Sequence, residues 1–237
     1  MNRPDRNERS TSEVNVIIVV CAKLPAYVYP IIRGEVGRTA PAVPAGSRRC
    51  RTMVGMPAEL SERLVELFRW IDPGPQSDHL VSDVSGWWRD PAVLAGLGPA
   101  LAAPFRDARP TVVLAPAVTG LLLGPLAATS LGVGFVPAYK AGDGRAPAGP
   151  TTWAQSPPDF RGRRVDLGVR DRHLGPGDRV LVVDDWVATG AQLQALYAIC
   201  AARGARVIGT SAVVVDCPPA LATELRVRGL VDAERLG

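Results

Sequence analysis

The chain has 237 residues, of which 47% are hydrophobic and 21% are charged, a composition typical of a globular protein with one well-packed domain. The net charge of +4 would suit a nucleic-acid partner, but residues 1–56 hold nine Lys or Arg against four Asp or Glu, and residues 57–237 hold 18 against 19. The body of the chain is therefore nearly neutral, which argues against a nucleic-acid-binding protein.

The N-terminal segment, residues 1–56, is predicted to lie outside the folded domain. Residues 23–56 are rich in Pro, Gly and Arg and show no sustained periodicity, which is typical of coil. Met53 and Met56 stand just before the first convincing helix. We therefore expect residues 1–56 to be a disordered or misassigned extension and residues 57–237 to form the domain.

Cysteine usage and hydropathy favour a cytoplasmic protein. The four cysteines show neither a CxxC motif nor close pairing, and Cys200 falls on the apolar face of a predicted helix, which indicates a buried free thiol. The apolar run Val14–Ala22 follows three arginines, as in a signal peptide, but Asn15 interrupts it and it is too short to span a bilayer. We expect neither secretion nor a membrane partner.

From residue 57 onward the hydrophobic pattern predicts alternating helices and strands. Pro57 suits a first helical turn, and leucines follow it at helical spacing. Asp90 is predicted to cap a helix that opens with Pro91. The expected elements in chain order are a helix from 57, a loop over 72–79, a helix over 91–103, a strand over 112–115, a helix over 120–131, a strand over 133–139, a loop over 141–164 and a strand over 165–169.

The clearest unit follows after residue 175. Val180–Val183 is a continuous apolar run, as expected of a parallel strand that is buried on both faces. We expect a polar loop over Asp184–Gly190, a helix over 191–203 that ends at Gly204, and a strand over 207–215. This βαβ unit implies a right-handed crossover and a doubly wound α/β sheet. The Gly/Pro/Arg-rich loop over 141–164 is long enough to be a functional lid or a disordered segment.

Residues 179–192 carry the strongest chemical signal. In an open α/β sheet, ligands bind at the carboxyl ends of the strands. A small-residue turn over 188–191, directly before a helix, offers converging backbone N–H groups and the positive end of the helix dipole, which suits a phosphate. Asp184 and Asp185 beside it can accept hydrogen bonds from a diol or lie near a magnesium ion. A phosphate and a vicinal diol together describe a ribose 5-phosphate.

This segment resembles the phosphoribosyl pyrophosphate (PRPP) signature of type I phosphoribosyltransferases: four apolar residues, two acids, two apolar residues, then x-Thr-Gly-x-Thr. The resemblance implies a doubly wound, mostly parallel sheet with a small hood region, and magnesium that is bound through PRPP rather than directly by the protein. It implies that Asp184 and Asp185 hold the ribose hydroxyls. Gln192 stands where the family usually has Thr or Ser, and can still donate a hydrogen bond. The residues implied to cradle the 5′-phosphate are Ala188, Thr189, Gly190, Ala191 and Gln192.

Three further segments, residues 81–91, 121–127 and 132–140, are similar to adenine phosphoribosyltransferases and occur in the same order. The chain also departs from that pattern. Thr119-Gly120 stands where that family has an Arg-Gly pair that contacts pyrophosphate, and Val81-Ser82 replaces the Phe-Arg that packs on adenine. These departures leave the identity of the acceptor base open.

Individual roles follow from the resemblance, each beside a simpler interpretation. Lys140, the only lysine after residue 23, matches a lysine that reaches pyrophosphate, or is a surface lysine. Arg161 in the loop closes over pyrophosphate, or is solvated. The implied catalytic residues are Asp159, which would manage the proton of the base, and Lys140; the implied pyrophosphate ligands are Thr119, Gly120, Lys140 and Arg161; the implied base pocket holds Val81 and Trp186.

The resemblance thus implies an enzyme that transfers 5-phosphoribosyl from PRPP to a purine-like nucleobase and releases pyrophosphate, with magnesium as cofactor and a homodimer as assembly. One alternative is a transferase for another acceptor, such as guanine, hypoxanthine, xanthine or a non-purine. A second alternative is a regulatory protein that binds PRPP without catalysis. The replacement at Thr119 would suit it, as would the loop, where residues 156–164 stand in place of an acid-bearing stretch of the family.

Overall fold

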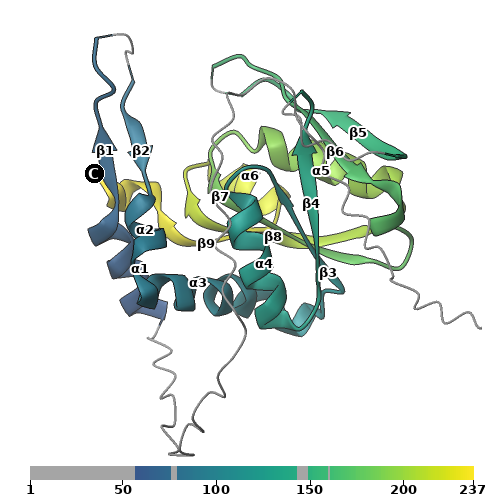
Figure 1. Ribbon diagram of the computed structural model, residues 1–237, viewed down its shortest axis with the longest axis horizontal. Coiled ribbons are helices and arrows are strands. Elements are labelled where there is room, and N and C mark those ends of the chain that lie inside the picture. The colour runs from purple at the N-terminus through teal and green to yellow at the C-terminus, as the bar shows by residue number, and fades with distance from the viewer. Residues whose placement is uncertain (1–56, 76–78, 143–148, 160) are drawn as a thin grey trace, which may run out of the picture. The chain divides into compact units, whose positions relative to one another are not determined.

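The computed structural model describes residues 57–237, except 76–78, 143–148 and 160, so the expectation for residues 1–56 lies outside the described residues. A seven-stranded sheet in the order β5-β6-β4-β3-β7-β8-β9 forms its centre (Figure 1). Neighbouring strands from β4 to β9 are parallel, and β6 and β5 add antiparallel pairs at one edge. The expectation of a mostly parallel α/β sheet is therefore confirmed. The strands are β3 (Val112–Pro116), β4 (Gly134–Lys140), β5 (Thr151–Gln155), β6 (Asp166–Arg170), β7 (Arg179–Val187), β8 (Arg206–Val215) and β9 (Val227–Asp232).

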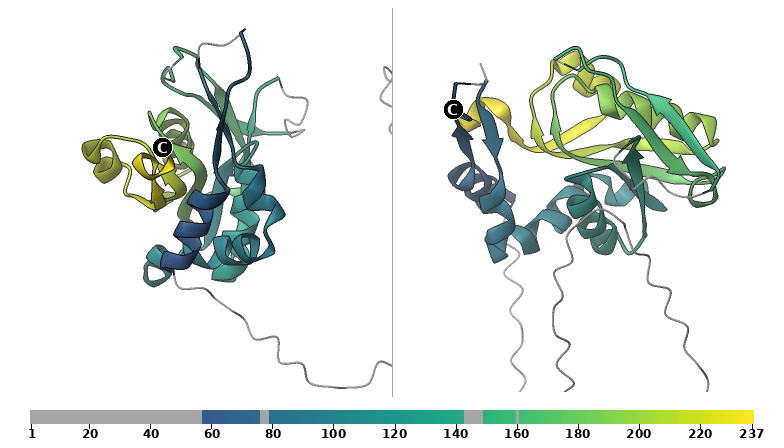
Figure 2. Two further views of the ribbon diagram at one scale, coloured as in Figure 1. Left: turned by 90° about the vertical axis from the view of Figure 1, so that its left-hand side faces the viewer. Right: turned by 45° about the horizontal axis from the view of Figure 1, so that its top comes forward.

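Helices cover both faces of this sheet (Figure 2). On one face α3 and α4 pack together and contribute Leu97, Leu101 and Leu123 to a buried cluster. On the other face α5 contributes Leu193 and Leu196 to a second buried cluster. Burying a leucine side chain fully contributes about 1.5–3 kcal/mol, so the two clusters hold the sheet between its helices. The helices are α1 (Pro57–Leu67), α2 (Ser85–Arg89), α3 (Pro91–Ala102), α4 (Gly120–Leu131), α5 (Ala191–Ala202) and α6 (Pro219–Glu224), with 3₁₀ turns at Ala103–Ala108, Asp171–His173 and Ala233–Leu236.

Strand β7 is apolar at successive positions, without alternating apolar and polar residues, because both of its faces are covered. Leu181 and Val183 lie in the cluster of α3 and α4, whereas Val180 and Val182 lie in the cluster of α5. Successive side chains of a strand point to opposite faces, so a strand that is covered on both sides is apolar at every position. The expected burial of Val180–Val183 on both faces is confirmed.

Two of the expected loops are wrong in part. β7 extends through Val187, because its pairing with β8 continues to Val215, so Asp184 and Asp185 belong to the strand and not to a loop. The region 141–164 contains β5, which pairs with β6 as an edge strand. Its Trp153 packs directly over Gly168, where an added Cβ would lie 2.5 Å from the indole ring. Both pairings are long-range, and the local pattern of residues does not reveal them.

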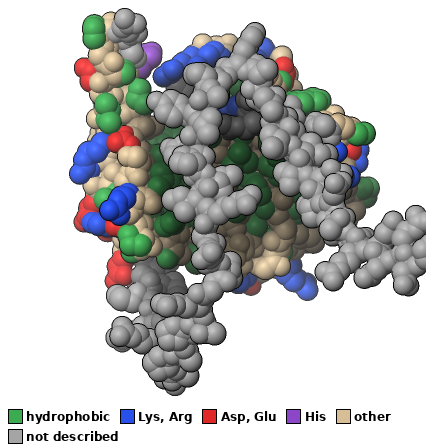
Figure 3. Space-filling view, in the orientation of Figure 1, with side chains coloured by type: hydrophobic (Ala, Val, Ile, Leu, Met, Phe, Trp, Pro, Cys, Tyr) green, Lys and Arg blue, Asp and Glu red, His purple; other side chains and the backbone are tan. Residues whose placement is uncertain are grey.

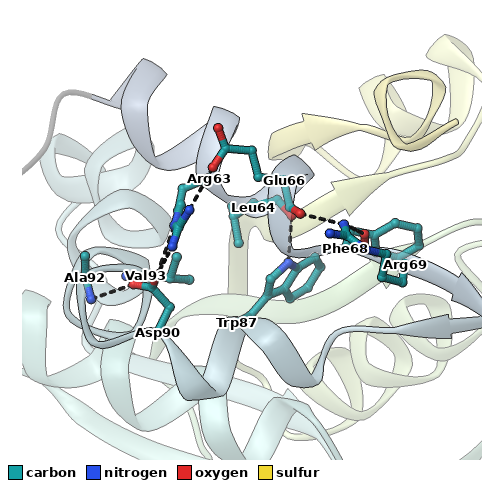
Figure 4. A network of polar contacts seen from close by, with 9 residues as sticks. All are labelled: Arg63, Leu64, Glu66, Phe68, Arg69, Trp87, Asp90, Ala92 and Val93. Carbon is teal, nitrogen blue, oxygen red and sulfur yellow. Dashed lines mark hydrogen bonds and ion pairs between the residues drawn. The ribbon is translucent and has the colours of Figure 1, made fainter.

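A small hood stands beside the sheet and consists of α1, a hairpin of β1 (Arg69–Ile71) and β2 (Val81–Asp83), and α2. The fully buried Trp87 anchors it by donating its indole N–H to the Leu64 carbonyl at 2.9 Å (Figure 4). As expected, the Asp90 carboxylate caps α3 by accepting from the backbone N–H groups of Ala92 and Val93, and Arg63 of α1 donates to its second oxygen at 2.8 Å. The cap thus ties the hood to the first helix of the sheet domain. Within the described part of the chain, no helix has the length and hydrophobicity that a bilayer span requires.

Candidate functional site

A cavity of about 890 Å³ opens where β7 ends, between the sheet and the hood hairpin. Most of its lining comes from three parts of the chain: the β7–α5 connection, the hairpin β1–β2, and the turn that holds Asp159, Arg161 and Arg163. Asp216, directly after β8, and Gly237 complete the lining. Eleven of the residues singled out from the sequence line it: Val81, Asp159, Arg161, Asp184, Asp185, Trp186, Ala188, Thr189, Gly190, Ala191 and Gln192.

The two acids of β7 form the polar floor of the cavity. Asp184 is only 4% exposed, and its neighbour Asp185 is half-buried. Burial raises the pKa of the Asp184 carboxyl well above its usual range, and the adjacent Asp185 charge raises it further, whereas the charge of Lys140 lowers it. Asp184 Oδ1 accepts one hydrogen bond, from the Asp185 backbone N–H at 2.9 Å. A buried carboxylate with so few donors is stabilised by a ligand that brings hydroxyl groups or a cation.

The connection from β7 to α5 forms an anion cradle. Gly190 adopts φ +66°, a left-handed conformation that glycine accepts readily, and this turn directs the chain into α5. Thr189 Oγ1 accepts from the Ala191 backbone N–H at 3.3 Å. The first N–H groups of a helix have no partner within the helix, so the start of α5 presents donors and the positive end of its dipole to the cavity. This arrangement suits a phosphate.

Gln192, the departure from the family signature, also lines this cradle. Its side-chain Oε1 is buried and, among the described residues, has no hydrogen-bond partner. An unpartnered buried oxygen is costly, so a ligand or water that donates to Oε1 would stabilise the Gln192 side chain.

Three of the predicted pyrophosphate ligands lie at or after the carboxyl ends of strands β3 and β4 but do not line the cavity. Lys140 is the last residue of β4, and its charge reaches Asp184. Thr119 and Gly120 lie at the start of α4, just after the cis peptide bond between Ala117 and Val118. A Cβ at Gly120 would lie 2.9 Å from the Ala115 Cβ, so close packing of α4 on β3 explains this glycine without any ligand.

Asp159, predicted to manage the proton of the base, lines the cavity, but its carboxylate already accepts hydrogen bonds from neighbouring residues. Its carboxylate accepts from the backbone N–H groups of Arg161 and Arg163 at 2.8 and 2.9 Å, and from the Arg163 guanidinium at 3.1 and 3.2 Å. These hydrogen bonds, the one from the Arg163 backbone above all, lower the pKa of Asp159. A carboxylate that is held ionised is a poor proton donor. The geometry favours a structural task for Asp159, which is to shape the turn that presents Arg161 and Arg163 to the cavity.

The wall opposite the cradle is aromatic. The Trp186 ring lies 5.9 Å from the rings of both Trp70 and Phe68, so the end of β7 packs against the hood. Trp70 and Val81 of the hairpin are 40% and 48% exposed, and green hydrophobic side chains are visible along the hairpin in Figure 3. The cavity therefore has two halves. The cradle half holds Asp184, Asp185 and residues 188–192 and suits a sugar phosphate. The aromatic half holds Trp70, Val81, Trp186 and Asp216. Trp70 and Asp216 of this second half were not predicted, because only the fold brings them to Trp186.

The described residues contain no group of three or more His, Cys, Asp or Glu side chains that could hold a metal ion. Asp184 and Asp185 are nevertheless oxygen donors of the kind that magnesium prefers. The donor set thus fits a magnesium ion whose remaining ligands come from a bound substrate and from water.

Comparisons with known proteins match this site. Residues 89–225 match the family model of the phosphoribosyl transferase domain. The adenine phosphoribosyltransferase of Streptomyces coelicolor is 31% identical over 153 residues, which cover 65% of this chain and 81% of the relative. That of a Nocardioides species is 40% identical over 152 residues, 62% of this chain and 79% of the relative. The solved structure of the Giardia lamblia enzyme complexed with 9-deazaadenine aligns with a TM-score of 0.63 at 27% identity, and covers 73% of this chain and 97% of that chain.

Proposed function

Because this chain belongs to the phosphoribosyl transferase family, we propose that it transfers the 5-phosphoribosyl group of PRPP to adenine and releases pyrophosphate. One observation carries the proposal: the buried Asp184, the adjacent Asp185 and the Gly190 turn line one cavity at the carboxyl end of β7. The relatives named above are adenine phosphoribosyltransferases, which supports a purine as the acceptor.

PRPP binds along β7 and the start of α5. Asp184 and Asp185 accept hydrogen bonds from the ribose hydroxyls, and the backbone N–H groups around Gly190 hold the 5′-phosphate. The acceptor base lies against Trp186 and the hairpin residue Val81, in the aromatic half of the cavity.

The reaction breaks the bond between the anomeric carbon and a pyrophosphate oxygen, and forms a bond from a base nitrogen to that carbon. Positive charge develops on the ribose, and negative charge develops on the pyrophosphate. In this proposal Lys140, which ends β4 outside the cavity lining, and Arg161, which lines the cavity, stabilise the leaving group. Magnesium bound with PRPP adds positive charge at the same group.

Asp159, Arg161 and Arg163 line the cavity, and in this proposal they reduce the access of water to it. Exclusion of water matters here because water competes with the base for the activated ribose. The Asp159 turn and its arginines thus serve both to bind pyrophosphate and to suppress hydrolysis of PRPP.

The proposal includes a cytoplasmic location and a homodimeric assembly. Cys200 and Cys217 are both free thiols, as is common in the reducing cytoplasm. Exposed apolar side chains on α3 and α4, those of Leu94 and Leu122, suit the subunit interface of a homodimer.

The test combines binding and turnover. Asp184→Asn with Asp185→Asn is expected to abolish PRPP binding in calorimetry while circular dichroism remains that of the wild type. Wild-type protein with magnesium and PRPP should release pyrophosphate in the presence of adenine. PRPP affinity that survives in the double variant would contradict the assignment of the site.

A second candidate function is PRPP binding without catalysis. Thr119 and Gly120 lie outside the cavity lining, and no arginine stands at that position. PRPP binding by the wild type, without pyrophosphate release for any base in a panel, would favour this regulatory function.

A further inference from the structure

Asp216 follows the last residue of β8 and lines the cavity on its aromatic side. It is an exposed acid, so its carboxylate can reach a ligand in the cavity. Trp186, to which Asp216 is hydrogen-bonded, and the hairpin residues Trp70 and Val81 also line the cavity, and their side chains carry no charge. Asp216 thus brings a carboxylate to the aromatic surroundings in which the proposed function places the base.

Two hydrogen bonds fix the position of this carboxylate. The Asp216 backbone N–H donates to the Val187 carbonyl at 2.8 Å, which ties the end of β8 to the end of β7. The Trp186 indole N–H donates to Asp216 Oδ2 at 3.1 Å. The side chain is therefore oriented before any ligand arrives, as a residue that discriminates between ligands must be.

The remaining acceptor capacity of Asp216 points to the chemistry of its ligand. An ionised carboxylate has about four lone-pair sites, and the indole uses one of them. Among the described residues no donor to Oδ1 is present and no cation forms an ion pair with Asp216. A carboxylate repels phosphate and pyrophosphate, so among the groups of the proposed substrates an N–H donor of the base suits it best.

We propose that Asp216 accepts a hydrogen bond from the exocyclic amine of the acceptor base and thereby selects a 6-aminopurine over a 6-oxopurine. The inference rests on the proposed function. Adenine presents an amine to Asp216, whereas hypoxanthine presents a carbonyl oxygen, whose lone pairs oppose those of the carboxylate. Trp186 acts as a positioning residue, because its indole N–H holds the carboxylate in place.

Asp216→Asn tests this directly, because the amide keeps the shape of the side chain but can donate to a carbonyl. For adenine kcat/KM should fall by about 10- to 100-fold. For hypoxanthine kcat/KM should rise. The ratio of kcat/KM for adenine to kcat/KM for hypoxanthine should therefore fall by a larger factor than kcat/KM for adenine does. Trp186→Phe, which removes the indole N–H and keeps an aromatic ring, should lower the same ratio by about 3- to 10-fold.

Asp232→Asn is the matched control. Asp232 ends the neighbouring strand β9, pairs in register with Val215 and is exposed, but it does not line the cavity. This variant should keep the wild-type ratio.

The outcomes distinguish a failure of this inference from a failure of the proposed function. Wild-type protein that transfers to adenine, together with an unchanged ratio in Asp216→Asn, would overturn the inference and leave the proposed function standing. An equal loss for both bases would also overturn it, because that pattern belongs to a residue that serves PRPP or magnesium. Absence of transfer by the wild type to either base would overturn the proposed function and this inference with it.

Discussion

The two halves of the cavity are built in different ways. The cradle half, which holds Asp184, Asp185 and residues 188–192, comes from one short stretch of chain, in which a strand, a turn and a helix start bring every group into place. The aromatic half combines Trp70 of the hairpin, Trp186 of β7 and Asp216 at the end of β8. In the proposed function, local geometry therefore recognises the sugar phosphate, and contacts between distant segments recognise the base. A variant in one half should therefore leave ligand binding in the other half unchanged.

The largest effect is expected from Gly190→Val. A β-branched side chain at φ +66° is strained, and its Cβ would lie 2.7 Å from the Leu225 side chain, so the turn that forms the anion cradle should shift. PRPP affinity should fall by about 100-fold, equivalent to about 2.7 kcal/mol. Calorimetry with PRPP measures the loss. Binding of a base analogue to the variant should change little, and an equal loss there would show that the two halves are not separable.

Trp70→Ala probes the other half. Loss of the edge contact with Trp186 should raise KM for adenine by about 10-fold, while the Kd of PRPP remains that of the wild type. Steady-state kinetics with adenine varied at saturating PRPP measure the effect. Trp153→Ala is the control, since this tryptophan of β5 has a similar exposure, 42%, and does not line the cavity. A PRPP affinity that falls in parallel would contradict the division.

Asp159→Asn distinguishes a structural role from a proton-transfer role. The amide keeps part of the turn that holds Arg161 and Arg163, so kcat should fall only about fivefold. The pH dependence of kcat should keep the wild-type limbs. A decrease of about 100-fold or more, together with loss of one limb, would restore Asp159 as an acid–base catalyst.

The smallest effect concerns the stability of the protein without PRPP. The pKa of Asp184 is raised in the folded state, so between the usual carboxyl pKa and this raised value the folded protein binds more protons than the unfolded chain. The free energy of unfolding must therefore fall as pH rises through that window. Asp184→Asn removes this loss, and should raise Tm at neutral pH by about 2–4 °C, equivalent to about 1 kcal/mol. Calorimetric scans at several pH values test the prediction, and a lower Tm in the variant would contradict it.

The same contrast explains how much could be predicted from the sequence. The acid pair, the Gly190 turn and the alternating burial of β7 leave their marks within fourteen residues, so the fold class and the cradle could be predicted. The strand β5 could not, because an edge strand depends on pairing with β6 and not on a local pattern. Asp216 and Trp70 could not either, since each acquires its place only through contacts with Trp186. The role of Asp159 in handling the proton of the base stays a prediction, beside which its hydrogen bonds from Arg161 and Arg163 favour a structural task.

The hydrogen bond from the Asp216 backbone to Val187 affects how such a protein can evolve. The bond uses only main-chain atoms, so every residue except proline preserves it. Position 216 can therefore exchange its side chain while the ends of β7 and β8 stay joined and the acid pair stays untouched. If Asp216 selects the base as inferred, gene copies of this protein can acquire new acceptors through single codon changes at the end of one strand, and the donor sugar stays the same.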